Sequence, residues 1–375
     1  MYITELCKKT KKASFSLSSI SEKKIDECLI KVSENLLKEK EFLKQENQKD
    51  ILNAKSAGKT DAFIDRLTLT DKVIEGMAEG LMQISGLKSP AYKTVYKHYN
   101  TEQGISVLKK AVPFGVIGII YESRPNVTAD AFALCFKTKN AVILKGGSES
   151  VLSNMAIVKV IKNTLKDLSI DENAINLIED TSRETTAKFI KMNEFIDLLI
   201  PRGSASLINF AVQNATVPII ETGAGNCHAY IDKYANFEKA VNVVFNAKTH
   251  RYSVCNALES IVIHKDVLPD LLPLIYNKLQ EKGVEMRLDT PSYKVLQGKD
   301  NVVKAEKQDF YTEFGGPVIS VKTVYSIKGA IEHINKHSTK HSETIITENT
   351  KNAKKFQREI DSSTVYVNTS TRMTD

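Results

Sequence analysis

The stretch GVIGIIYESRPNVTADAFALCFKTKNAVILKGGSES, residues 115–150, contains the pattern that decides the fold. Two short apolar runs, 115–120 and 141–145, flank a segment with the apolar spacing of a helix, 128–138. A strand that is buried on both faces reads as a continuous apolar run, and a helix between two such strands makes a parallel β-α-β unit. The stretch therefore predicts a doubly wound α/β fold, in which ligands bind at the carboxyl ends of the strands.

The segments before and after this stretch extend the pattern. Upstream we expect one long amphipathic helix over 19–57 with a capping box at Ser19 and Glu22, a helix over 71–85, and two strands within 95–112. Downstream, helices are expected at 148–167, 181–192 and 203–214, and strands at 173–178, 197–200 and 217–221. A second α/β series follows from 225, with helices at 236–247, 266–281, 328–336 and 350–360 and strands at 257–263, 317–324, 344–347 and 364–368.

Composition excludes several classes of protein. The chain has 375 residues, 42% of them hydrophobic, which disfavours a disordered chain, and five cysteines, too few for a disulfide scaffold. No apolar run approaches the ~18 residues of a membrane span, and the first residues lack a signal peptide, so we expect a cytoplasmic protein. The net charge is +7, but the lysine-rich segment 1–60 contains no Arg and few aromatics, which disfavours nucleic-acid binding. The alternatives are a solvated helix face or a mild attraction for small anions.

Polar residues follow several of the expected strands. Asn126 follows the first and offers an amide donor, although a helix cap is the simpler role for this residue. The turns KGGSES (145–150) and PRGSAS (201–206) combine glycine with a serine at a helix start, so backbone N–H groups can approach a phosphate or a ribose closely. The usual G-x-G-x-x-G fingerprint is absent from this unit. Glu221, at the end of the strand expected at 217–221, is a candidate base or hydrogen-bond acceptor.

One cysteine differs from the other four. Cys255 lies in the polar segment NAKTHRYSVCNALES (246–260), close to His250 and Arg251, and nearby cationic groups favour the reactive thiolate. The alternative is another buried thiol, which is the expected role of Cys7, Cys28 and Cys135. The pair Cys227-His228 has no second cluster nearby in the sequence, so we expect no metal site and interpret the pair as loop residues that pack under a site.

Seven motifs together resemble the gamma-glutamyl phosphate reductase family of the aldehyde dehydrogenase superfamily. They are VPFGVIGIIYESRPNVTADA, ILKGGSES, PRGSASLI, VPIIETGAGNCHAYID, NAKTHRYSVCNALES, HSETIIT and VYVNTSTRMTD. The resemblance extends from the first helix to residue 375, with the motifs in the family's order and spacing. It implies an aldehyde dehydrogenase-like α/β fold with a Rossmann-like cofactor domain at 1–94 and 113–224, a β-hairpin oligomerisation arm at 95–112 and an α/β catalytic domain at 225–375.

The resemblance also implies an activity and its residues. The reaction is the NADPH-dependent reduction of L-glutamate 5-phosphate to L-glutamate 5-semialdehyde, with release of phosphate, in proline biosynthesis. A homodimer is expected, with glutamate 5-kinase as a further partner. The residues that match the family's catalytic positions are the nucleophile Cys255, the oxyanion-binding Asn126 and Glu221, a substrate-binding or proton-relaying residue here. Those that match its cofactor-binding positions are Lys145, Ser148, Glu149, Gly203, Ser204 and Glu313.

Two features leave alternatives open. Lys145 at a strand end favours the 2′-phosphate of NADPH, whereas Glu149 nearby favours the free hydroxyl of NADH. Family members continue beyond STRMTD into a tail that joins the sheet between subunits, so the resemblance implies a missing tail after Asp375. The alternative functions are an aldehyde dehydrogenase that uses another acyl donor, such as a CoA thioester, and a catalytically impaired binding protein.

Overall fold

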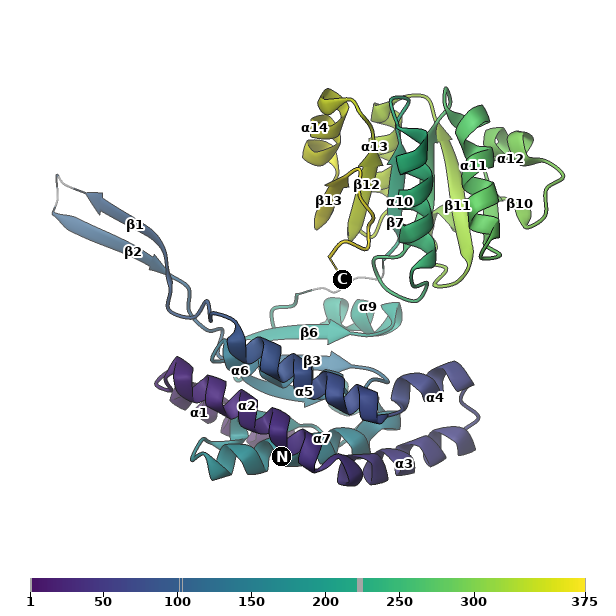
Figure 1. The fold of residues 1–375 in the computed structure, drawn as a ribbon. Coiled ribbons are helices and arrows are strands. Elements are labelled where there is room, and N and C mark those ends of the chain that lie inside the picture. The colour runs from purple at the N-terminus through teal and green to yellow at the C-terminus, as the bar shows by residue number, and fades with distance from the viewer. Residues whose placement is uncertain (1, 101, 103, 221–224, 375) are drawn as a thin grey trace. The chain divides into compact units, whose positions relative to one another are not determined.

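The computed structural model describes residues 2–100, 102, 104–220 and 225–374 (Figure 1). The chain forms two compact units, Met1–Thr222 and Gly223–Asp375, which we call the N-terminal and the C-terminal unit. Each unit contains its own parallel sheet and its own hydrophobic core.

The sheet of the N-terminal unit confirms the β-α-β prediction. Its four strands are β3 (Val116–Tyr121), β4 (Ala141–Lys145), β5 (Ile175–Leu177) and β6 (Leu198–Arg202), all parallel and in the order β5-β4-β3-β6. Every residue of β3 and β4 is buried, as continuous apolar runs require. The connections are α6 (Val127–Lys137), the 3-10 turn η1 (Ser148–Ser150) with α7 (Val151–Asp167), and η2 (Glu172–Ala174), and α8 (Arg183–Phe189) leads into β6.

The long helix expected at 19–57 is wrong. The chain forms α2 (Glu22–Lys38) and α3 (Lys40–Ser56), separated at Glu39, whose backbone leaves the helical region at ψ 15°. The true N-cap of α2 is Ser21, which accepts a hydrogen bond from the Lys24 N–H, and not Ser19. The break is invisible to periodicity because helical residues continue on both sides of it.

Other helices complete the N-terminal unit. The expected helix at 71–85 is α5 (Asp71–Gly86), and α9 (Ala205–Asn214) follows β6. Two helices were not expected, α1 (Tyr2–Leu17) and α4 (Asp61–Leu67). Lys11 of α1 donates to both carboxylate oxygens of Asp197 at 2.7 Å, and Asp197 accepts the N–H of Val116 at 2.8 Å, so an ion pair ties α1 to the start of β3.

The two strands expected within 95–112 form an antiparallel hairpin. It consists of β1 (Thr94–Asn100) and β2 (Ile105–Lys110), and Gly104 lies in the turn with φ +67°. The hairpin extends from the helices of the N-terminal unit (Figure 1). Several apolar side chains on it are exposed, including Val95, Tyr96, Ile105 and Val107.

The strand expected at 217–221 is reduced to one bridge. Ile219 pairs with Leu199 of β6, and Leu199 donates to the carbonyl of Pro218 at 2.8 Å. Pro218 has no N–H, so a ladder cannot propagate through it. Glu221 lies outside the residues that the structure describes.

The C-terminal unit is a seven-stranded parallel sheet in the order β10-β9-β11-β8-β7-β12-β13. The expected strands are β8 (Leu258–His264), β11 (Val318–Val324), β12 (Ser342–Ile346) and β13 (Thr364–Val367), whereas β7 (Cys227–Ile231), β9 (Glu285–Leu288) and β10 (Val302–Lys304) were missed. The helices are α10 (Phe237–Thr249), α11 (Leu268–Gln280), α12 (Thr290–Leu296), α13 (Ile327–His337) and α14 (Thr350–Glu359), of which α12 was not expected, and η3 (Lys307–Tyr311) is a 3-10 turn.

Two layers of helices cover the two faces of this sheet (Figure 1). Ala229 and Ile231 of β7 pack in one core with residues of α10, α11 and α12, while Tyr230 between them packs with α13 and α14. This alternation is the period of a strand that is buried on both faces. Across the described residues, none of the helices has the length and apolarity to cross a membrane.

Candidate active site

Lys145 ends β4 at the carboxyl edge of the N-terminal sheet. It pairs in register with Ile120 of β3 and is 3% exposed. Burial lowers the pKa of Lys145, and the nearby charge of Asp180 opposes that effect. Hydrogen bonds from Thr185 and Ser182 lower the pKa of Asp180 to about 2, so its carboxylate stays charged at neutral pH. The edge therefore contains a buried ammonium group with a fixed anion within electrostatic reach.

Glu149 connects the ends of β3 and β4. Its carboxylate accepts a hydrogen bond from Ser123 Oγ at 2.9 Å and one from Ser148 Oγ at 3.3 Å. Ser123 has a left-handed backbone, φ +53°, directly after β3. Lys145, Ser148 and Glu149 are thus brought to one edge of the sheet, in the turn that the KGGSES pattern predicted.

Glu122 connects the end of β3 to the start of α9, a contact that sequence reasoning missed. Its carboxylate accepts the Ser204 N–H at 2.8 Å and the Ser204 hydroxyl at 3.1 Å. A Cβ on Gly203 would lie 2.6 Å from Glu122 Oε2, so only glycine lets the carboxylate approach so closely. Glu122 directly follows an apolar strand, and this position was the one sequence signal that could have marked it as a site residue.

Asn126 is the N-cap residue of α6, but its side chain makes no capping hydrogen bond. Its amide donates instead to Asp130 Oδ2 at 3.3 Å, a long hydrogen bond. Burial raises the pKa of Asp130, and the bond from Asn126 opposes the shift. The simpler role of a helix cap is therefore wrong for this side chain, and one N–H of the amide is not used in that bond.

Cys255 lies in the loop between α10 and β8 of the C-terminal unit and is half-buried. Main-chain contacts hold the loop: Cys227 Sγ donates to the Cys255 carbonyl at 3.3 Å, and Thr371 Oγ1 donates to the Asn256 carbonyl at 2.7 Å. A Cβ on Gly225 would overlap the carbonyl group of Cys255. The other cysteines are buried, as expected, and burial raises the pKa of Cys7, Cys28 and Cys135 to about 12.

A buried ion pair joins the two ends of the Cys255 loop, and it was not anticipated from the sequence. Lys248 Nζ lies 2.7 Å from Glu259 Oε2, and both side chains are 0% exposed. Glu259 Oε1 also accepts the N–H of Gly315 at 3.3 Å. Glu313, two residues earlier in that loop, is exposed. Burial raises the pKa of Glu259 to about 7 and lowers that of Lys248, while each charge stabilises the other.

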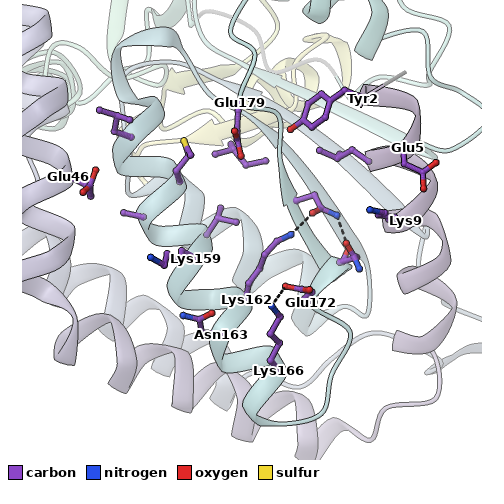
Figure 2. Close-up of a pocket in the computed structure, with 18 of the residues that line it drawn as sticks. Tyr2, Glu5, Lys9, Glu46, Lys159, Lys162, Asn163, Lys166, Glu172 and Glu179 are labelled. Carbon is purple, nitrogen blue, oxygen red and sulfur yellow. Dashed lines mark hydrogen bonds and ion pairs between the residues drawn. The ribbon is translucent and has the colours of Figure 1, made fainter.

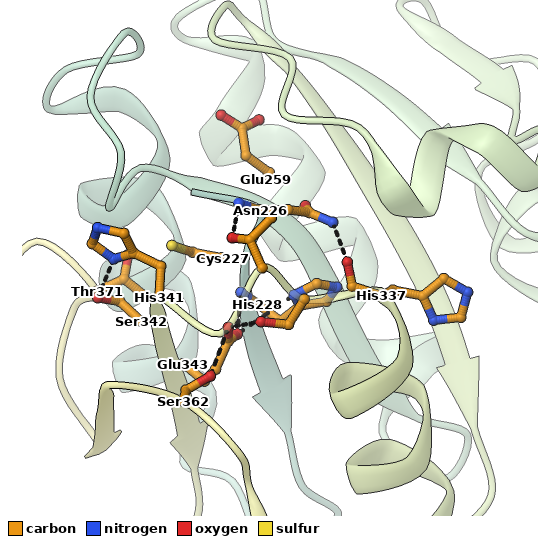
Figure 3. Close-up of polar contacts among 12 residues, drawn as sticks. Asn226, Cys227, His228, Glu259, His337, His341, Ser342, Glu343, Ser362 and Thr371 are labelled. Carbon is orange, nitrogen blue, oxygen red and sulfur yellow. Dashed lines mark hydrogen bonds and ion pairs between the residues drawn. The ribbon is translucent and has the colours of Figure 1, made fainter. Parts of the chain in front are cut away.

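The pair Cys227-His228 begins a buried strand, so its interpretation as loop residues is wrong. Figure 3 shows Glu343 of β12 beside His228: its carboxylate accepts the His228 N–H at 2.6 Å and a hydroxyl from Ser362 at 3.3 Å. The ring of His228 lies edge-on to His333, with the centroids 6.0 Å apart. Within the described ranges, no group of three or more His, Cys, Asp or Glu residues could hold a metal ion.

A separate groove of about 1080 Å³ lies in the N-terminal unit (Figure 2). It is bounded by α1, α3, α7 and β5, and two of its lining residues are joined by a hydrogen bond that Lys162 donates to Asn176 Oδ1 at 2.5 Å. None of the described candidate residues lines this groove. The candidate residues of the N-terminal unit lie instead at the strand ends.

Comparisons with known proteins agree on one family. A model of the aldehyde dehydrogenase family matches residues 2–294 and 301–375. The chain is 46% identical over 374 residues to gamma-glutamyl phosphate reductase of Clostridium acetobutylicum, covering 100% of this chain and 88% of the relative. It is 49% identical over 367 residues to the protein of that name from Lachnospira eligens, covering 98% and 88%.

Solved structures agree with the sequence relatives. Gamma-glutamyl phosphate reductase of Thermotoga maritima superposes with a TM-score of 0.96 at 40% identity, covering 99% of this chain and 89% of that one. A glyceraldehyde-3-phosphate dehydrogenase of Methanocaldococcus jannaschii, complexed with NADP, has a TM-score of 0.67 at 18% identity, covering 98% and 86%. At 18% identity, the similarity to the Methanocaldococcus jannaschii structure shows a shared fold only.

Proposed function

The chain belongs to the aldehyde dehydrogenase family, and from that premise we propose that it reduces L-glutamate 5-phosphate to L-glutamate 5-semialdehyde, with release of phosphate, in proline biosynthesis. The observation that carries the proposal is the 46% identity to a gamma-glutamyl phosphate reductase over the whole chain. The Cys255 loop, held by its main chain, is consistent with a nucleophile whose side chain does the chemistry.

The reaction begins at Cys255. Its thiolate attacks the acyl carbon of the acyl phosphate, a carbon–sulfur bond forms, and the bond from that carbon to the phosphate oxygen breaks with its electron pair leaving on phosphate. The oxyanion of the tetrahedral intermediate needs hydrogen-bond donors, for which we assign the Asn126 amide and the Cys255 backbone N–H. Each such donor is typically worth about 3 kcal/mol of the barrier. Glu221 is assigned to substrate binding or proton relay, because a base that activated water would hydrolyse the thioester.

The cofactor is assigned to the carboxyl edge of the N-terminal sheet, which makes that unit the cofactor domain, 1–94 and 113–224, and 225–375 the catalytic domain. When bound, NADPH supplies the hydride that reduces the thioester to the aldehyde. The residues fit such a group at Glu149, which offers acceptors for ribose hydroxyls, while the Gly203-Ser204 turn is assigned to the pyrophosphate and Glu313 to the nicotinamide ribose. The buried ammonium of Lys145 supports NADPH over NADH.

The hairpin of β1 and β2 is assigned to pairing of subunits in a homodimer, because its exposed apolar side chains would be covered there. Glutamate 5-kinase, which would supply the acyl phosphate, is proposed as a further partner. A cytoplasmic location agrees with five free cysteines.

The test uses the full chain in the easier reverse direction, with L-glutamate 5-semialdehyde, phosphate and NADP. We expect NADPH to form only when phosphate is present, and Cys255→Ala to lose turnover. Formation of NADPH that requires CoA instead of phosphate would favour another acyl donor. Binding of NADPH without turnover would favour an impaired binding protein, and full activity of Cys255→Ala would refute the assigned nucleophile.

A further inference from the structure

The ion pair between Lys248 and Glu259 is completely buried. Among the described residues it is the one Lys–carboxylate or Arg–carboxylate pair in which both side chains are 0% exposed. Such pairs contribute little to stability, because removing two charges from water offsets most of their attraction, and apolar replacements are often neutral. The role of the pair is therefore sought in what its two members hold in place, beginning with the segment of chain between them.

The pair closes the loop that contains Cys255. Lys248 lies in the last turn of α10, and Glu259 is the second residue of β8. The segment 249–258 leaves one end of the pair and returns to the other. The distance of 2.7 Å between Nζ and Oε2 thus fixes the separation of the two ends of the loop.

The second carboxylate oxygen of Glu259 makes a contact with a different loop. Oε1 accepts the N–H of Gly315, whose left-handed backbone, φ +60°, lies two residues after Glu313. The charge of Glu313 also lies within electrostatic reach of both members of the pair. Only a carboxylate accepts hydrogen bonds on both oxygens, because an amide presents donors on one side.

We propose that Lys248 and Glu259 are positioning residues that set the Cys255 loop and the Glu313 loop in fixed relation to each other. This inference rests on the proposed function, in which one loop carries the acylated sulfur and the other contacts the nicotinamide ribose. The pair touches neither substrate nor cofactor in this scheme. It acts through the two loops, and its effect falls on hydride transfer, which depends most steeply on the distance between reacting atoms.

The decisive variant is the apolar double substitution Lys248→Met/Glu259→Met, which leaves no unpaired buried charge and should fold. The matched control is Lys239→Gln/Glu348→Gln in the same unit, where the ion pair has a similar distance, 2.9 Å, but both side chains are about half exposed. For the Met/Met variant we expect a melting temperature within a few degrees of the wild type, kcat lower by about 30-fold or more, and KM values within about threefold. The primary isotope effect with NADPH deuterated at the transferred position should rise.

A readout without turnover separates this inference from the proposed function. In hydrogen exchange, the amides of 250–257 and 313–316 should exchange about tenfold faster in the Met/Met variant, with the rest of the unit unchanged. If the wild type lacks phosphate-dependent activity, the proposed function fails, and exchange alone decides whether the pair couples the two loops. Unchanged exchange in 313–316 overturns the coupling. A folded, active Met/Met variant with wild-type kcat and isotope effect overturns the positioning role.

Discussion

Gly225 offers the sharpest test of how the Cys255 loop is held. Glycine at this position lies against the main chain of Cys255, and an added Cβ would overlap the carbonyl group and lie 2.9 Å from the Cys255 Cα. Observed Cβ atoms essentially never approach other heavy atoms within 3.0 Å. Because the obstructing atoms belong to the backbone, no side-chain rotation can relieve the overlap, so Gly225→Ala must displace the loop itself.

The size of the effect follows from that displacement. Clearing the carbonyl oxygen to 3.0 Å requires a shift of about 2 Å, and a misplacement of about 1 Å in a reacting group already lowers the rate by about 10²-fold. At about 1.4 kcal/mol for each tenfold change, this raises the barrier by about 2.8 kcal/mol. The strain also lowers the free energy of unfolding by about 1–3 kcal/mol, as overpacking does.

The assay compares kcat of Gly225→Ala and of Gly329→Ala in the phosphate-dependent reverse reaction. Gly329→Ala is the matched control, because its Cβ would meet only Ser326 Oγ, at an ordinary 3.6 Å. We expect the control to retain the wild-type kcat and Gly225→Ala to lose about 99% of it. A Gly225→Ala variant with wild-type kcat and melting temperature would refute the argument that Gly225 holds the Cys255 loop by close backbone contact.

Two further predictions concern charge. Lys145→Met should raise the KM for NADPH by about tenfold and the KM for NADH far less. The control is Lys162→Met, because Lys162 is half-buried and lies away from the strand ends, and this variant should change neither KM. Burial lowers the pKa of His333 to about 2, below the 6.5 of an unfolded histidine. The unfolded state therefore binds more protons than the folded state below pH 6.5. As the pH is lowered below 6.5, this group decreases the free energy of unfolding by up to about 1.4 kcal/mol per pH unit. His333→Phe should flatten that slope in urea denaturation between pH 6.5 and 5, and the exposed control His250→Gln should not.

The sequence predicted the sheets best where burial is simplest. The apolar runs at 115–120 and 141–145 were recognised because a strand buried on both faces is mostly apolar, and they form β3 and β4. The strand Cys227–Ile231 was not predicted, because its interior contains the polar residue His228, which pairs with Glu343 on the neighbouring strand. The break between α2 and α3 at Glu39 was not predicted either, because the helical pattern of apolar residues continues through it.

In the candidate site, too, features with a local sequence signal could be predicted and contacts between distant residues could not. The turns around Lys145 and Gly203 could be predicted because glycine, serine and a strand end are local signals. The contacts of Glu122, Lys248 and Glu259 could not, since a charged residue usually faces water and nothing local in the sequence names its partner. Their partners lie 82, 11 and 56 residues away in the chain, so the contacts exist only after the sheet has formed.

The contacts around Cys255 also define what its substitution leaves in place. Cys227 bonds to the carbonyl of Cys255, Thr371 bonds to the carbonyl of Asn256, and Gly225 packs against the main chain. All three contacts are made to backbone atoms, which Cys255→Ala leaves in place. The loop therefore keeps these three main-chain restraints when the sulfur is removed, so what Cys255→Ala takes away is the thiol together with the thiol's own contacts.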